Sequence, residues 1–202
     1  MSTLTETKQE IITLDAATFA DLLSGAAIAA DSSRDSMPRL AAVYLSAVNG
    51  ELIATSTDRF RMAVGSIKLE AGELSHAGIS LADIKRISAM IKPYITGKQL
   101  NKQTITLARV SDILALSIGG DSVSVSLNGY EFPDYSHLMS EEFSPVPSVA
   151  LNLTLLASLA KIPHDSTKPV IVGFTGEKKA IQIKLSHEVI KWDILLMPMR
   201  TA

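Results

Sequence analysis

The segment Ile194-Leu195-Leu196-Met197-Pro198-Met199-Arg200-Thr201-Ala202, the last nine residues, organises the interpretation of this chain. Just before it, Trp192, Ile194 and Leu196 alternate with Asp193 and Leu195, as in a strand with at least one buried face, until Pro198 stops the pattern. Methionine is unbranched and polarizable, so a Met-Pro-Met tip suits a surface that accepts several partner side chains. The same methionines could instead close the end of a sheet, and the segment alone leaves both interpretations open.

The composition bounds the class of protein. The chain has 202 residues, 47% of them hydrophobic, which is enough for one large or two small domains with real cores. It has no cysteine, which excludes disulfides and thiolate metal sites and favours a reducing compartment. Because no apolar run approaches the roughly 20 residues that span a bilayer, we expect a soluble cytoplasmic protein with no membrane partner.

The charge is unevenly distributed. The net charge is −2, but residues 76–112 hold six Lys/Arg against two acids, whereas residues 1–75 hold six against ten. A mildly acidic protein can still present a positive face to phosphate, since the field depends on local arrangement. The alternative for Lys85, Arg86 and Lys92 is an ordinary solvated helix face.

A pattern of strand, helix and three strands occurs three times. In the first repeat the strands are expected at 11–14, 41–47, 51–56 and 61–69 and the helix at 16–30. In the second repeat the strands are expected at 78–81, 104–109, 113–118 and 122–127, with a helix at 82–92 that Pro93 ends. In the third, the strands are expected at 149–151, 170–175, 180–185 and 189–197 and the helix at 153–161. The sequence therefore predicts an α+β fold of three βαβββ units.

The repeats also predict the domain organisation. Residues 1–139 hold two units, residues 140–147 form a proline-containing linker, and residues 148–202 hold the third unit. One helix covers only one face of three or four strands, so units must pair or stack to bury both faces. An odd number leaves one unit without an internal partner, which favours self-association.

Local motifs give the repeat a family resemblance. Three segments resemble motifs of bacterial DNA polymerase sliding clamps, the beta subunit: Ala54-Thr55-Ser56-Thr57-Asp58-Arg59-Phe60-Arg61-Met62-Ala63, Tyr130-Glu131-Phe132-Pro133-Asp134-Tyr135 and Met197-Pro198-Met199-Arg200. Asn152-Leu153-Thr154-Leu155-Leu156, followed by Leu159, is similar to a helix of the last clamp domain. The resemblance implies the DNA clamp fold, with antiparallel sheets outside and helices on the inner face. It also implies that residues 1–139 are like the middle clamp domain, that the third unit is like the second half of the last domain, and that the first domain is missing.

In the family, a hydrophobic pocket between the middle and last domains receives short peptide motifs of polymerases. The resemblance places the pocket here at Thr57, Phe60, Arg61, Met62, Pro133, His137, Leu138, Leu196, Met197, Pro198, Met199 and Arg200. An extended peptide would insert aliphatic and aromatic anchors among the methionines, with Arg61 and Arg200 near the rim. Arg59-Phe60 and His137 depart from the family pattern, so we expect a different peptide preference. The alternative for Pro133 is a rigid turn beside a packed Tyr135.

The family closes a ring of twelve helices around duplex DNA. With three units per chain, four chains would supply twelve helices, although a trimer or an assembly that is not a ring stays open. The candidates for the inner wall are Lys85, Arg86, Lys92, Lys98 and Lys161. Such cations would contact phosphates and read no bases, so DNA binding would be independent of sequence.

The resemblance therefore implies a processivity factor that tethers a DNA polymerase. It would be a non-enzymatic, nucleoid-associated protein, needing an ATP-dependent clamp loader as partner and no cofactor or metal. The four histidines (His76, His137, His164 and His187) lack metal-ligand spacing, and there is no phosphate-binding loop motif. A second interpretation is a clamp-like interaction protein that forms no ring and binds or sequesters clamp-binding peptides. The short length would suit a phage-encoded version.

Overall fold

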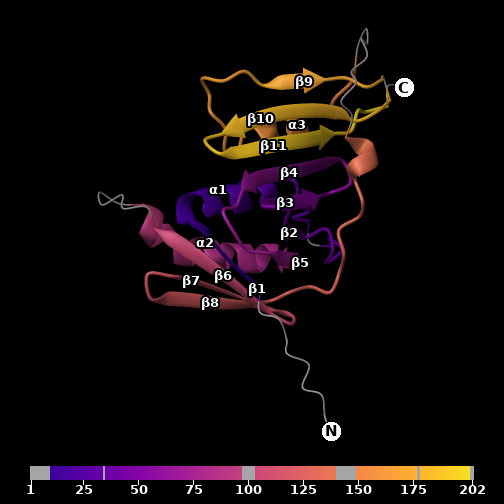
Figure 1. Cartoon of the computed structure of the whole chain (residues 1–202). Coiled ribbons are helices and arrows are strands. Elements are labelled where there is room, and N and C mark those ends of the chain that lie inside the picture. Colours follow the sequence, from indigo (N-terminus) through magenta and orange to yellow (C-terminus); the bar gives the residue numbers. More distant parts are fainter. Residues whose placement is uncertain (1–9, 34, 97–102, 140–148, 177, 201–202) are drawn as a thin grey trace.

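A computed structural model describes residues 10–33, 35–96, 103–139, 149–176 and 178–200 (Figure 1). The first unit consists of β1 (Glu10–Asp15), α1 (Ala16–Ala27), β2 (Ala42–Val48), β3 (Glu51–Thr57) and β4 (Arg61–Lys68). The second consists of β5 (Leu74–Ser80), α2 (Leu81–Ile95), β6 (Thr104–Val110), β7 (Ile113–Ile118) and β8 (Asp121–Ser126). After a short 3-10 helix, η1 (Ser136–Leu138), the third unit consists of α3 (Leu153–Leu159), β9 (Ile171–Gly173), β10 (Ile181–His187) and β11 (Ile190–Leu196).

The helices α1, α2 and α3 each begin directly after a capping side chain. Asp15 accepts a hydrogen bond from the Thr18 N–H at 2.8 Å, and Ser80 accepts one from the Asp83 N–H at 3.1 Å. Asn152 accepts from the N–H groups of Thr154 and Leu155 at 2.9 and 3.2 Å. These bonds satisfy N–H groups that have no partner within the helix, so polar residues before an apolar stripe fix where each helix starts.

The strands form two sheets, and one of them crosses from the first unit into the third. The four-stranded sheet has the order β1-β6-β7-β8, and the seven-stranded sheet has the order β5-β2-β3-β4-β11-β10-β9. The first two units exchange their first strands, because β1 pairs with β6 and β5 pairs with β2. The antiparallel pairing of β4 with β11, from Arg61 opposite Leu196 to Ser66 opposite Lys191, joins the third unit.

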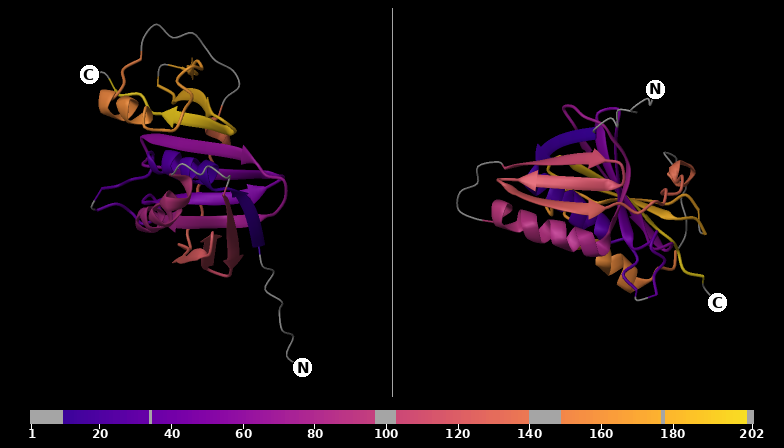
Figure 2. Two further views of the ribbon diagram at one scale, coloured as in Figure 1. Left: turned by 90° about the vertical axis from the view of Figure 1, so that its left-hand side faces the viewer. Right: turned by 90° about the horizontal axis from the view of Figure 1, so that it is seen from below.

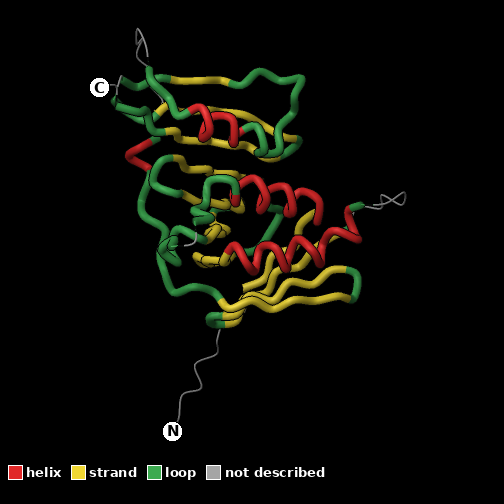
Figure 3. The backbone as a smooth tube through the Cα atoms, turned by 180° about the vertical axis from the view of Figure 1, so that it is seen from behind, coloured by secondary structure: helices red, strands yellow, loops and turns green. Residues whose placement is uncertain are grey.

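The helices α1, α2 and α3 all lie on the same side of the strands (Figures 2 and 3). Phe19 of α1 and Ile87 of α2 are fully buried in the core beneath this helix layer. Trp192 of β11 is also buried, and its ring occupies the space where a Cβ on Gly25 or Gly65 would stand. Two glycines thus make room for the large side chain that anchors the third unit to the first.

The structure corrects several predicted bounds. Helix α2 continues through Pro93, because a proline in the last turn costs one hydrogen bond and the Thr96 N–H still reaches Lys92 O at 3.0 Å. Helix α1 ends at Ala27 and α3 at Leu159, earlier than the predicted 30 and 161. The expected domain limits between 139 and 148 adjoin residues 140–148, which lie outside the described part.

The predicted strand at 149–151 is wrong, since these residues belong to no sheet. Their counterparts β1 and β5 are strands because the neighbouring unit offers them a sheet edge. For 149–151 the chain provides only a bond from the Met199 N–H to Ala150 O, at 2.8 Å, among the described residues. An extended segment without a neighbour is not a strand.

Candidate functional site

Most of the predicted pocket residues gather where the first and third units meet. The loop between β3 and β4 lies against the segment that follows β11, because the Met197 N–H donates to Phe60 O at 2.8 Å. Leu196 is opposite Arg61 in the β4–β11 pairing. The pairing therefore places two motifs far apart in the sequence side by side.

Side-chain hydrogen bonds hold the β3–β4 loop. Asp58 Oδ1 accepts from the N–H groups of Phe60 and Arg61, both at 2.9 Å. Thr57 Oγ1 donates to Arg61 O at 2.8 Å, and Arg59 adopts a positive φ of 76°. A carboxylate that bonds backbone amides two and three residues ahead fixes a tight turn, so Phe60 is presented on a rigid loop.

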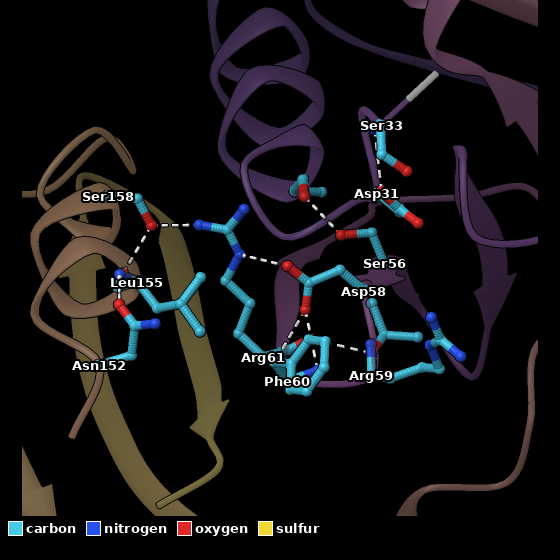
Figure 4. Close-up of polar contacts among 12 residues, drawn as sticks. Asp31, Ser33, Ser56, Asp58, Arg59, Phe60, Arg61, Asn152, Leu155 and Ser158 are labelled. Carbon is cyan, nitrogen blue, oxygen red and sulfur yellow. Dashed lines mark hydrogen bonds and ion pairs between the residues drawn. The ribbon is translucent and has the colours of Figure 1, made fainter. Parts of the chain in front are cut away.

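Arg61 ties the two units together (Figure 4). Its Nε donates to Asp58 Oδ2 at 2.9 Å, and its Nη1 donates to the hydroxyl of Ser158 on α3. Ser158 in turn donates to Leu155 O at 2.6 Å. The guanidinium is thus held by groups of both units rather than extending freely into solvent.

The accessible apolar side chains at this junction come from both units. Phe60, Met197 and Met199 are exposed, Arg200 is exposed, and Pro198 is half-buried. Met62 and Leu196, also predicted pocket residues, are buried. Met62 is opposite Leu195 and Leu196 is opposite Arg61, so these two side chains lie on opposite faces of the sheet. The junction therefore offers two methionines and a phenylalanine for contact.

The segment carrying Pro133 is anchored by aromatic contacts. The Tyr44 ring stacks on His76 with centroids 5.1 Å apart and lies 5.3 Å from the Phe132 ring. The Phe132 N–H donates to His76 Nε2 at 2.9 Å. Partial burial against these rings lowers the pKa of His76, and the charge of Arg109 acts in the same direction, while Glu131 opposes them.

A cavity of about 230 Å³ lies beside this segment. It unites two predicted residues, Thr57 and Pro133, with six residues outside the predicted set: Met37, Arg39, Leu40, Arg59, Glu131 and Phe132. The last three of these lie in the motifs that carry the family resemblance. A larger hollow of about 540 Å³, lined partly by Ile11, Leu14 and Gly72, includes none of the predicted site residues.

His137 and Leu138 lie on η1 and are exposed. Figure 1 shows η1 beside the ends of β4 and β11, and Met139 next to it accepts a hydrogen bond at its sulfur from Gln182 of β10, at 3.7 Å. No signal in the sequence indicates the ties made by Ser158 or Gln182, because their partners are distant in the chain. Asp58 could have been identified from its place two residues before Phe60.

The predicted DNA-facing cations lie at the helix layer. Lys85, Arg86 and Lys92 are exposed on α2, and Arg86 pairs with Asp83 at 2.7 Å. Lys161 is exposed directly after α3. Lys98 lies outside the described residues.

Neither a metal site nor a membrane-spanning helix occurs in the described part of the chain. The His, Asp and Glu side chains there form no group of three placed to hold a metal ion. Among the helices formed by the described residues, none has both the length and the apolar character needed to span a bilayer.

Antiparallel sheets with all helices on one side, built from repeated units joined edge to edge, define the α+β DNA clamp fold. Comparisons with known proteins confirm the resemblance to the bacterial sliding clamp. The chain is 25% identical over 150 residues to the beta sliding clamp of Micrococcus luteus, a match that covers 74% of this chain and 47% of the relative. No family model matches the chain.

Solved structures give the same fold. The DNA polymerase III beta subunit of Thermotoga maritima superposes with a TM-score of 0.80 at 16% identity, covering all of this chain and 68% of the other. The sliding clamp of Bacillus subtilis superposes with a TM-score of 0.75 at 13% identity, covering all of this chain and 67% of the other. The match to the curated relative therefore spans about half of that relative, and the match to the solved clamps about two thirds of theirs.

Proposed function

We propose that this protein is a DNA sliding clamp, a ring-forming processivity factor that encircles duplex DNA and tethers a DNA polymerase. The observation that carries the proposal is the β4–β11 pairing, which continues one sheet across two units while keeping their helices on a common side. Repetition of such a junction bends a row of units into an arc with the helices inside. Three units per chain and twelve per ring give four chains.

The inner wall would hold DNA through phosphates. Lys85, Arg86 and Lys92 project from α2 on long side chains, and the described part of α1 carries no Lys or Arg. Cations on mobile side chains bind the phosphate backbone without reading bases, and this lets a ring slide. The ring performs no chemistry, so its effect is topological: it raises the effective concentration of the polymerase at the primer end.

The junction site would bind the polymerase. An extended peptide from the partner would place aliphatic and aromatic anchors against Met197, Met199 and Phe60. Arg200 at the rim would favour an acidic residue in the peptide. A ring has to be opened for loading, so an ATP-dependent clamp loader and other proteins with similar peptides are further expected partners.

Retention on DNA tests the proposal. The protein is placed by a loader on a nicked circular duplex and then passed through a sizing column, before and after the circle is cut. We expect the protein to stay with the circle and to leave the linear product, because only a ring is held topologically. Equal release from both would contradict the ring and favour a clamp-like protein that only binds peptides.

Peptide binding is tested separately with a fluorescent peptide that carries leucine and phenylalanine anchors. Met199→Ser and Phe60→Ser should each weaken binding about tenfold, since removing an anchor contact typically costs more than about 1 kcal/mol. Val48→Ser, at an equally exposed valine on the β2–β3 hairpin, is the matched control and should leave the affinity unchanged.

A further inference from the structure

The third unit exposes apolar side chains at positions where the first two units bury theirs. Counting from the capping residue, Phe19 of α1, Ile84 of α2 and Leu156 of α3 occupy the same helical position. Phe19 is 0% exposed and Ile84 is 5% exposed, whereas Leu156 is 36% exposed. Leu153, at the first position of α3, is 76% exposed.

The first strand after the helix shows the same difference. Val172 of β9 is directly opposite the buried Ile183, so both side chains lie on the helix side of the sheet. Val172 is nevertheless 47% exposed, whereas Ile105 and Leu107 of β6 are fully buried. Leu153, Leu156, Val170 and Val172 together form what we call the third-unit face, with α3 at the end of the helix row in Figure 3.

The first two units show what covers such a face. Each covers the other: β1 of the first unit pairs with β6 of the second, β5 pairs with β2, and α1 packs against α2. This exchange is reciprocal, so the two units are related by an approximate two-fold axis. In the third unit both halves of the exchange are open, since residues 149–151 belong to no sheet and β9 pairs only with β10 among the described strands.

We propose that the third-unit face binds the third unit of a second copy of this chain across a two-fold axis. Residues 149–151 of each copy would add to β9 of the other, and the two α3 helices would pack as α1 and α2 do. A reciprocal exchange needs only one kind of unit, because a unit that offers both a free first strand and a free sheet edge is complementary to itself. The exact two-fold axis between the chains would then relate the two third units, as the approximate axis within the chain relates the first and second units.

The inference that third units pair depends on the proposed function only where it concerns how the chains close into a ring. Two chains joined in this way carry six units in a row, half of the twelve that a ring needs. Without the pairing, each third unit would keep an open sheet edge and a partly exposed helix, so the four chains of the proposed ring would carry four such edges.

Light scattering of the full chain and of two variants tests the pairing. Leu156→Asp and Leu153→Glu place a charge on the third-unit face, and Leu153 is too exposed to be needed for folding. We expect the unmodified protein to weigh at least twice 21.6 kDa and both variants to weigh half as much as it does. Val48→Asp, at an exposed valine outside the face, should keep the full mass. An unchanged mass in Leu153→Glu, or a monomeric unmodified protein, overturns the inference.

Hydrogen exchange shows where the contact lies. In the unmodified protein the amides of 149–151 and β9 should exchange slowly, and in Leu153→Glu they should exchange faster while those of β2 and β6 stay protected. Unprotected β9 amides in an oligomer would mean that the copies meet elsewhere. Failure of the pairing is distinguishable from failure of the proposed function, because retention on circular DNA is measured independently of where the chains meet.

Discussion

At the residue scale, the side chain of Arg61 is a polar link between the first and third units, beside the β4–β11 pairing and the contact of Asp21 with His187. Its side chain is 13% exposed and that of Asp58 is 12% exposed, so removing the guanidinium leaves a nearly buried carboxylate without its cation. We expect Arg61→Ala to lower the free energy of unfolding by about 1–3 kcal/mol, measured by urea denaturation. Arg86→Ala breaks a pair of the same spacing in which Arg86 is 59% exposed, and should cost at most about 0.5 kcal/mol. Equal losses in the two variants would contradict the structural role of Arg61.

The packing of Trp192 gives a second prediction at this scale. A Cβ on Gly65 would stand 2.5 Å from the Trp192 ring and 2.7 Å from Leu22, so Gly65→Ala overfills the contact between the units. Overpacking of this kind costs about 1–3 kcal/mol, and the melting temperature should fall accordingly. Gly129→Ala, where an added Cβ meets nothing within 4 Å, is the control and should melt like the unmodified protein.

At the element scale, the segment from Asn128 to Met139 depends on a neutral His76. Its Nε2 accepts the Phe132 N–H, and this requires an unprotonated nitrogen. Because the pKa of His76 is lower in the folded protein than the usual value of about 6.5, its contribution to stability is present above that pH. The contribution is lost as the pH falls from about 6.5 through the folded pKa.

We therefore expect peptide affinity and melting temperature to fall together on acidification below about pH 6.5, since this segment carries Pro133 of the candidate site. His76→Gln keeps a hydrogen-bond acceptor without a titrating ring and should flatten that dependence in thermal melts recorded across the pH range. A dependence as steep in His76→Gln as in the unmodified protein would assign the titration to another group.

The elements also show how far the sequence predicts the structure. Capping residues, hairpin turns and hydrophobic periodicity depend on near neighbours, so the helix starts at Ala16 and Leu153 and most strands follow from the sequence. Helix α2 begins at Leu81, one residue before the predicted start. The resemblance placed the β3–β4 loop beside the C-terminal segment. The prediction of a strand at 149–151 is wrong because a strand needs a paired neighbour, and the described residues provide none for this segment. Ser158 and Met37 were missed because nothing in their local sequence indicates a distant partner.

At the scale of the whole molecule, exposed cations lie both in the helix layer and on the opposite face of the sheet. Lys85 and Lys92 lie on α2, in the helix layer, whereas Lys191 precedes Trp192 on β11 and, by strand alternation, points away from that layer. If DNA passes along the helices, only the first two lysines contact phosphate. Removing positive charge should therefore have different effects on DNA binding at the two faces.

We expect the double variant Lys85→Ala and Lys92→Ala to weaken binding to short duplex DNA. The slope of its salt dependence should flatten by up to about 0.9 for each phosphate that a chain no longer neutralises. Binding is measured by fluorescence anisotropy over a series of salt concentrations. Lys191→Ala should leave both affinity and slope unchanged, because the outer face would meet no DNA in the proposed ring. A weakening by Lys191→Ala equal to that of the helix-layer variant would show attraction by overall charge, and the helices could then no longer be assigned to the inner wall of a ring.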